Sequence, residues 1–115
     1  MFDLVKIRKE LHSMAELSGK EVNTRAYLKN MLETMNPDEL LELSGSLIAV
    51  FDSKTAGENI AIRADIDALP ISETGTFAHR SKDPLVSHLC GHDGHSTILL
   101  GLAEHISQNR PESGK

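Results

Sequence analysis

The sequence predicts an α/β domain, because amphipathic helical patterns alternate with short apolar runs that are typical of buried strands. Helical spacing of apolar residues occurs near the N-terminus, over residues 22–35 and over residues 98–106. A continuous apolar run at residues 47–51 and an alternating one at residues 59–67 lie between the second and third helical patterns. Hydrophobic residues make up 39 % of the 115 residues and charged residues 25 %, which indicates at most one globular domain with an aliphatic core.

The N-terminal third predicts two helices. The first runs from about residue 3 to residue 17, with its apolar face formed by Leu4, Ile7, Leu11 and Met14. Ser18 followed by Glu21 has the form of a capping box, so we expect a second helix to start there. This helix should end at Asn36, because the residue before a proline disfavours helical dihedral angles.

The middle of the chain predicts strands. Residues 38–45 are compatible with a helical turn or a strand, whereas residues 47–51 are predicted as a strand that pairs with, or lies near, a second strand at 59–67. The period of two places isoleucines on one face of this second strand and Asp65 and Asp67 on the other. Ligands tend to bind at the carboxyl ends of strands in α/β sheets, so these two aspartates are site candidates. The alternative is a solvated strand end in which Arg63 pairs with one of them.

The most informative run is Ser87 to His95, which contains the only cysteine and three of the six histidines. Thiolate and imidazole are preferred donors for zinc and similar metals, and Gly91 allows Cys90 and His92 to face one ion. The sequence therefore predicts that Cys90 and His92 are metal ligands. The alternative is a polar turn in which Cys90 is a small buried residue and His92 bonds to the backbone.

The remaining polar residues near this run carry weaker predictions. A long loop is expected over residues 71–89, and Asp93 is predicted to cap a helix that continues to about residue 109. His95 would lie in the first helical turn, where the helix dipole disfavours a cation, so it is not predicted as a ligand. His88 is the next candidate ligand after Cys90 and His92. The other histidines, at 12, 79 and 105, have no supporting constellation in the sequence.

Charge and cysteine content exclude several classes of partner. The net charge of −5 and the lack of a basic stripe argue against binding to nucleic acid or to an anionic membrane. No segment has the pattern of a targeting signal or the length of a membrane span. Small-molecule or peptide-like ligands are better candidates on this charge balance. One cysteine cannot form an internal disulfide, so a cytoplasmic protein is expected.

Two motifs together resemble a known family. The segment Arg63 to Pro70, followed by the run Cys90 to His95, resembles the leading motifs of the metal-dependent amidohydrolase and carboxypeptidase family, which includes hippurate hydrolases, N-acyl-amino-acid amidohydrolases and auxin-conjugate hydrolases. The resemblance implies the first part of a zinc-peptidase-like three-layer α/β catalytic domain. It also implies two divalent ions, with zinc, manganese, cobalt and nickel all compatible with the donors. Cys90 and His92 match ligands in that family, Asp67 matches an orienting carboxylate, and Asp65 lies beside it.

The resemblance further implies hydrolysis of the amide bond of N-acyl amino acids or small peptides by an enzyme that is a homo-oligomer. Residues 1–115 would form the N-terminal portion of its catalytic domain. The glutamate base, the later histidine ligands and the dimerisation domain of the family follow the region that matches, so we expect the chain alone to be inactive. The alternative function is a non-catalytic fragment that binds a metal or a partner weakly.

Overall fold

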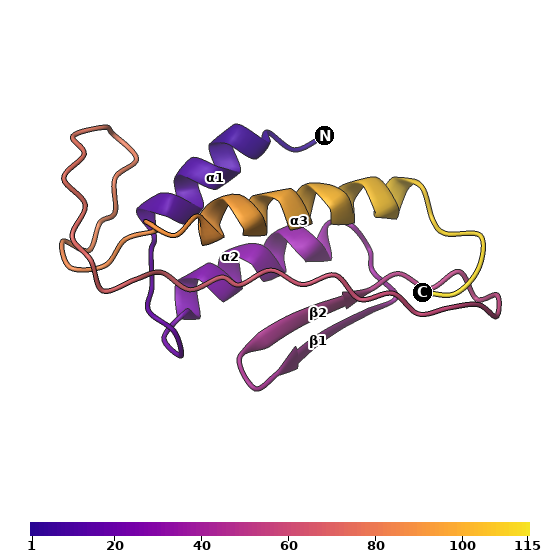
Figure 1. The fold of residues 1–115 in the computed structure, drawn as a ribbon. Coiled ribbons are helices and arrows are strands. Elements are labelled where there is room, and N and C mark those ends of the chain that lie inside the picture. Colours follow the sequence, from indigo (N-terminus) through magenta and orange to yellow (C-terminus); the bar gives the residue numbers. More distant parts are fainter.

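The computed structural model describes all 115 residues as three helices, one two-stranded sheet and long extended connections. The helices gather on one side of the strand hairpin and of the extended segment that precedes the long loop (Figure 1). α1 packs mainly against α3, and α2 contacts both α3 and β2. The predicted α/β class is confirmed.

The first helix, α1 (Leu4–Ser13), begins at Asp3, whose side chain accepts a hydrogen bond from the backbone N–H of Lys6 at 3.0 Å. It ends earlier than the predicted residue 17. The reason is a tertiary contact, because Leu17 forms a parallel bridge with Ala68 and the N–H of Ala68 donates to the carbonyl of Glu16. Residues 15–17 therefore run alongside a distant part of the chain instead of continuing the helix.

The second helix, α2 (Val22–Glu33), is capped by a side chain that precedes the helix in the sequence. The predicted capping box of Ser18 and Glu21 is wrong, because Glu21 is the N-cap and makes no side-chain cap bond. Instead, the carboxylate of Glu16 accepts hydrogen bonds from the N–H groups of Asn23 and Thr24, at 3.2 and 2.6 Å. A carboxylate at this end satisfies free amides and suits the helix dipole.

The hairpin consists of β1 (Glu39–Leu43) and β2 (Ser46–Val50), paired antiparallel. The turn residues Ser44 and Gly45 both have positive φ, as a two-residue hairpin turn requires. The strand predicted at 47–51 is confirmed within one residue, and the ambiguous segment 38–45 forms its partner. The proposed pairing of that strand with residues 59–67 is wrong, since β2 pairs only with β1.

Residues 59–67 belong to no sheet, so the strand predicted there is not formed. The segment is extended (Figure 1), and its last residues lie beside the start of α3, where the hydroxyl of Ser96 donates to the carbonyl of Asp65 at 3.0 Å. A strand is defined by ladder hydrogen bonds, and alternation of side chains cannot supply them without a neighbour. The C-terminal end of the segment is fixed by two isolated bridges, from Ala68 to Leu17 and from Leu69 to Ser87.

The last helix, α3 (His92–Gln108), begins at Gly91 in the left-handed conformation and not at Asp93 as predicted. Its buried Leu100 joins the main hydrophobic core, whose other fully buried members are Ile7, Leu11, Leu28 and Met35. A smaller cluster of Ala15, Ala68 and Val86 lies under the long loop. None of the three helices has both the length and the hydropathy that a membrane span requires. Leu100 packs α3 into the main core, and the candidate site lies where His92, at the start of α3, meets Asp67.

Candidate metal centre

His92 and Asp67 are brought together across 25 residues of sequence. The Nδ1 atom of His92 lies 3.0 Å from a carboxylate oxygen of Asp67 and 2.9 Å from the backbone carbonyl of the same residue. Both neighbours are acceptors, so Nδ1 carries the proton and the lone pair of neutral His92 is on Nε2. A histidine held in this way by a carboxylate and a carbonyl has the orientation that metal-binding histidines usually have.

Cys90 lies two residues before His92, is exposed and is not in a disulfide. Gly91 separates them with a φ of 93°, a left-handed conformation that glycine adopts without steric cost. This turn leads the chain directly from the thiol into the first turn of α3. The alternative of Cys90 as a buried hydrophobic residue does not hold, because its side chain is accessible.

Asp65 differs from Asp67 in its surroundings. Its carboxylate forms an ion pair with Arg63 and is exposed, whereas that of Asp67 faces His92. Asp67 therefore lies beside a candidate ligand, whereas the candidate role of Asp65 in the site stays a prediction. The carboxylate of Asp65 forms the surface ion pair with Arg63 that the sequence analysis gave as the alternative.

The sequence missed a buried polar cluster around His12. Its Nδ1 atom lies 2.8 Å from Asp93 and its Nε2 atom lies 2.7 Å from Glu73, and all three side chains are buried. Arg8 donates from Nε to the same oxygen of Asp93 at 2.9 Å. Asp93 thus joins α1 to the first turn of α3 in place of the predicted capping role. The signal available in sequence was Arg8 and His12 four residues apart, on one face of a helix.

This cluster sets the charge state of Glu73. Burial alone would raise the pKa of this carboxyl group, but the hydrogen bonds from His12 and from the N–H of Ser81 hold the pKa below its usual value.

His88 has the opposite surroundings. Burial lowers the pKa of its imidazole, and neither ring nitrogen has a hydrogen-bond partner. His88 is therefore a neutral buried ring, and its place as the next candidate ligand stays a prediction.

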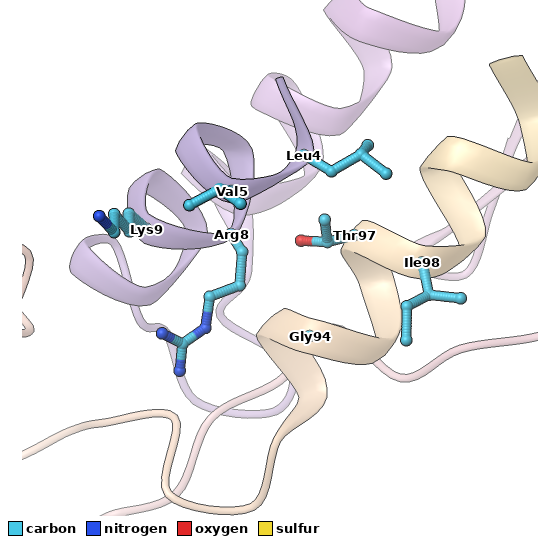
Figure 2. A pocket seen from close by; sticks show the side chains of 7 residues that line it. All are labelled: Leu4, Val5, Arg8, Lys9, Gly94, Thr97 and Ile98. Carbon is cyan, nitrogen blue, oxygen red and sulfur yellow. The ribbon is translucent and has the colours of Figure 1, made fainter. Parts of the chain in front are cut away.

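Cys90 and His92 together offer about two of the roughly four ligands that a zinc site needs. A thiol and an oriented imidazole suit zinc and its neighbours, but no group of three or more histidine, cysteine or acidic side chains in the structure could enclose an ion. A shallow groove of about 300 Å³ lies elsewhere, between α1 and α3 (Figure 2). It is lined partly by Leu4, Val5 and Ile98 and includes none of the candidate ligands.

Comparison with known proteins shows that the chain is similar to a family of peptidases and amidohydrolases. Residues 61–115 match the family model described as peptidase family M20/M25/M40. The chain is 41 % identical to an N-acyl-L-amino acid amidohydrolase of Geobacillus stearothermophilus, covering 96 % of this chain and 30 % of that protein. It is 35 % identical to an N-acetyldiaminopimelate deacetylase of Enterococcus faecalis, with the same coverage.

The fold agrees with the sequence relationship. The chain superimposes with a TM-score of 0.89, at 36 % identity, on the Bacillus subtilis YxeP protein, which is described as a dinuclear metal binding peptidase of the M20 family. This match covers 96 % of the chain and 32 % of YxeP. The chain therefore spans about 30 % of the length of the relatives it matches. The chain is thus similar in sequence, over residues 61–115, to peptidase family M20/M25/M40, and similar in fold, over 96 % of its length, to a solved protein described as a member of the M20 family.

Proposed function

We propose that this chain is the N-terminal part of a metal-dependent hydrolase that cleaves the amide bond of N-acyl amino acids or small peptides. In this proposal residues 1–115 form the first portion of the catalytic domain and contribute Cys90 and His92 to a site for two divalent ions. The observation that carries the proposal is the orientation of His92 by Asp67, beside an accessible thiol at the start of α3. The similarity to an N-acyl-L-amino acid amidohydrolase supports the substrate class.

Each residue has a distinct role in this proposal. Asp67 keeps the proton of His92 on Nδ1, so that Nε2 can donate its lone pair to a metal. Cys90 binds in its thiolate form, as a second donor on the same turn. A bound divalent cation would supply polarisation of the substrate carbonyl and a water of lowered pKa. The donors fit zinc, manganese, cobalt or nickel.

The same geometry argues that the chain alone hydrolyses its substrates poorly. A zinc site needs about four ligands, and no group of three or more histidine, cysteine or acidic side chains in the chain could enclose an ion. Hydrolysis also needs a group that accepts the proton of the attacking water. The carboxylate of Asp67 is already hydrogen-bonded to His92 and is not free for this task.

Titration with Co²⁺ tests the proposal, since a thiolate bound to Co²⁺ gives a characteristic charge-transfer absorption. We expect weak binding with this absorption in the wild type, no absorption for Cys90→Ser, and weaker binding for His92→Ala. His105→Ala is the matched control, because His105 is exposed at the other end of α3. Unchanged Co²⁺ binding and absorption in both Cys90→Ser and His92→Ala would overturn the proposed ligands. Robust hydrolysis of N-acetyl amino acids by the purified chain would contradict its incompleteness.

A further inference from the structure

The first turn of α3 is held from two sides by consecutive residues. His92 contacts Asp67, at the end of the extended segment. Asp93 contacts α1 instead, where one of its carboxylate oxygens lies 2.8 Å from Nδ1 of His12 and 2.9 Å from Nε of Arg8. Consecutive side chains of a helix point about 100° apart, so a fixed direction of the Asp93 side chain limits the directions open to that of His92.

The Asp93 carboxylate is buried and has a hydrogen-bond partner on each oxygen. Its other oxygen accepts from the N–H of Gly94 at 2.9 Å, and its side chain is 1 % exposed. Arg8 and His12 are four residues apart, so both reach one oxygen from the same face of α1, and the Arg8 side chain extends from α1 toward the start of α3 (Figure 2). Buried, charge-assisted bonds of this kind are costly to break. The start of α3 therefore has little freedom to turn against α1.

His12 joins this contact to the long loop. Its Nε2 atom lies 2.7 Å from Glu73, whose other carboxylate oxygen accepts from the N–H of Ser81 at 2.9 Å. The two ring nitrogens of His12 thus serve two different carboxylates, one in α3 and one in the loop. Substitution can separate the two contacts, because the NH₂ group of asparagine can lie near the position of Nδ1 and that of glutamine near the position of Nε2.

We propose that His12 and Arg8 are positioning residues for His92. By holding the carboxylate of Asp93, they keep the first turn of α3 in the rotation at which Nδ1 of His92 meets Asp67 and Nε2 stays available to a metal. The consequence for metal binding rests on the proposed function. The orientation of His92 is a property of the chain without a metal, so it is measured separately.

NMR of the ¹⁵N-labelled imidazole groups measures this orientation without metal. Nitrogen chemical shifts at mildly alkaline pH, where a free imidazole is neutral, show which ring nitrogen carries the proton. His92 of the wild type should be protonated mainly on Nδ1, and His12→Ala should give a mixture of both forms. His12→Asn keeps a donor for Asp93 and should resemble the wild type, whereas His12→Gln keeps only the contact with Glu73 and should resemble His12→Ala. The same Nδ1 form in the wild type and in His12→Gln would overturn the proposal.

Leu11→Ala is the matched control for a general loss of stability, because Leu11 is buried in the main core on the same helix and is not part of the cluster. It should leave the Nδ1 form of His92 unchanged under conditions in which circular dichroism shows intact helices. Arg8→Ala removes a partly exposed donor, so it should fold even if His12→Ala does not, and should shift His92 in the same direction by a smaller amount. An equal effect of Leu11→Ala and His12→Ala, or no effect of Arg8→Ala, contradicts the positioning role.

Titration with Co²⁺ distinguishes failure of this inference from failure of the proposed function. The affinity for Co²⁺ should fall by about tenfold in His12→Ala and His12→Gln, and stay within about threefold of the wild type in His12→Asn and Leu11→Ala. A wild type without thiolate-to-cobalt absorption contradicts the proposed ligands, and the NMR measurement on His92 still decides its positioning. Wild-type absorption together with equal affinities of His12→Gln and His12→Asn contradicts the positioning role and leaves the proposed ligands in place.

Discussion

The Nδ1 atom of His12 lies 2.8 Å from the carboxylate of Asp93, joining two helices through residues that are 81 positions apart. Asp93 also accepts from Arg8, and His12 reaches Glu73 with its other nitrogen. Asp93, which directly follows His92, is thus held by two side chains of α1, and one of these, His12, also binds Glu73 of the long loop. The buried cluster and the candidate metal centre consequently share the first turn of α3.

Removal of His12 should destabilise the chain strongly. His12→Ala removes one hydrogen-bond donor from each of the buried carboxylates of Asp93 and Glu73, and we expect the free energy of unfolding to fall by about 3 kcal/mol. His12→Asn, whose amide can still donate near the position of Nδ1, should recover part of this loss. Urea denaturation measures both. The exposed control His105→Ala should change stability by less than about 0.5 kcal/mol, and an equally small effect of His12→Ala would show that the cluster does not stabilise the fold.

The two glycines at the start of α3 should respond to alanine in opposite directions. A Cβ atom at Gly91 or at Gly94 would meet no other atom within 4 Å, so the difference is one of backbone conformation. Gly91 has a φ of 93°, and alanine there should cost about 1–2 kcal/mol. Gly94 is helical, and alanine there should stabilise by about 0.5–1 kcal/mol. Thermal unfolding of the two variants checks this, and a shift of the same sign in both would contradict the left-handed start of α3.

The pH dependence of stability should contain a contribution from Glu73. The pKa of this carboxyl group is lower in the folded chain than its ordinary value of 4.5. Its contribution is therefore complete above pH 4.5 and is lost as the pH falls through the lower folded value. Glu73→Gln removes the charge, so the stability difference between wild type and variant should be largest near neutral pH and shrink in acid. A difference that is constant from neutral to acid pH would contradict the lowered pKa of the Glu73 carboxyl group.

Asp67 and Asp65 should differ in their effect on metal binding. Loss of the carboxylate in Asp67→Ala leaves His92 with only the backbone carbonyl as a partner for Nδ1, so affinity for Zn²⁺ should fall by about tenfold. Asp65→Ala removes a side chain that faces Arg63, and affinity should stay within about twofold of the wild type. Isothermal titration calorimetry compares the two. An equal loss in both variants would assign Asp65 the same role as Asp67.

Local patterns in the sequence determined the helices, the strand at 47–51 and the family relationship. Apolar spacing of three to four residues identifies a helix whatever lies around it, because the buried face is a property of the helix itself. The Cys90 to His95 run was recognisable for a similar reason, since its donors are adjacent in the chain. That Cys90 and His92 bind a metal remains a prediction, which the contact between His92 and Asp67 supports.

Only the tertiary structure decided where distant residues meet. Glu16 caps α2, Leu17 pairs with Ala68, and His12 binds Asp93, and none of these contacts follows from spacing along the chain. In the segment at 59–67, the sequence pattern predicted a strand that the tertiary structure does not form. Its alternating side chains suit a strand, but the hydrogen bonds that make a strand come from a neighbour, and no part of the chain supplies one.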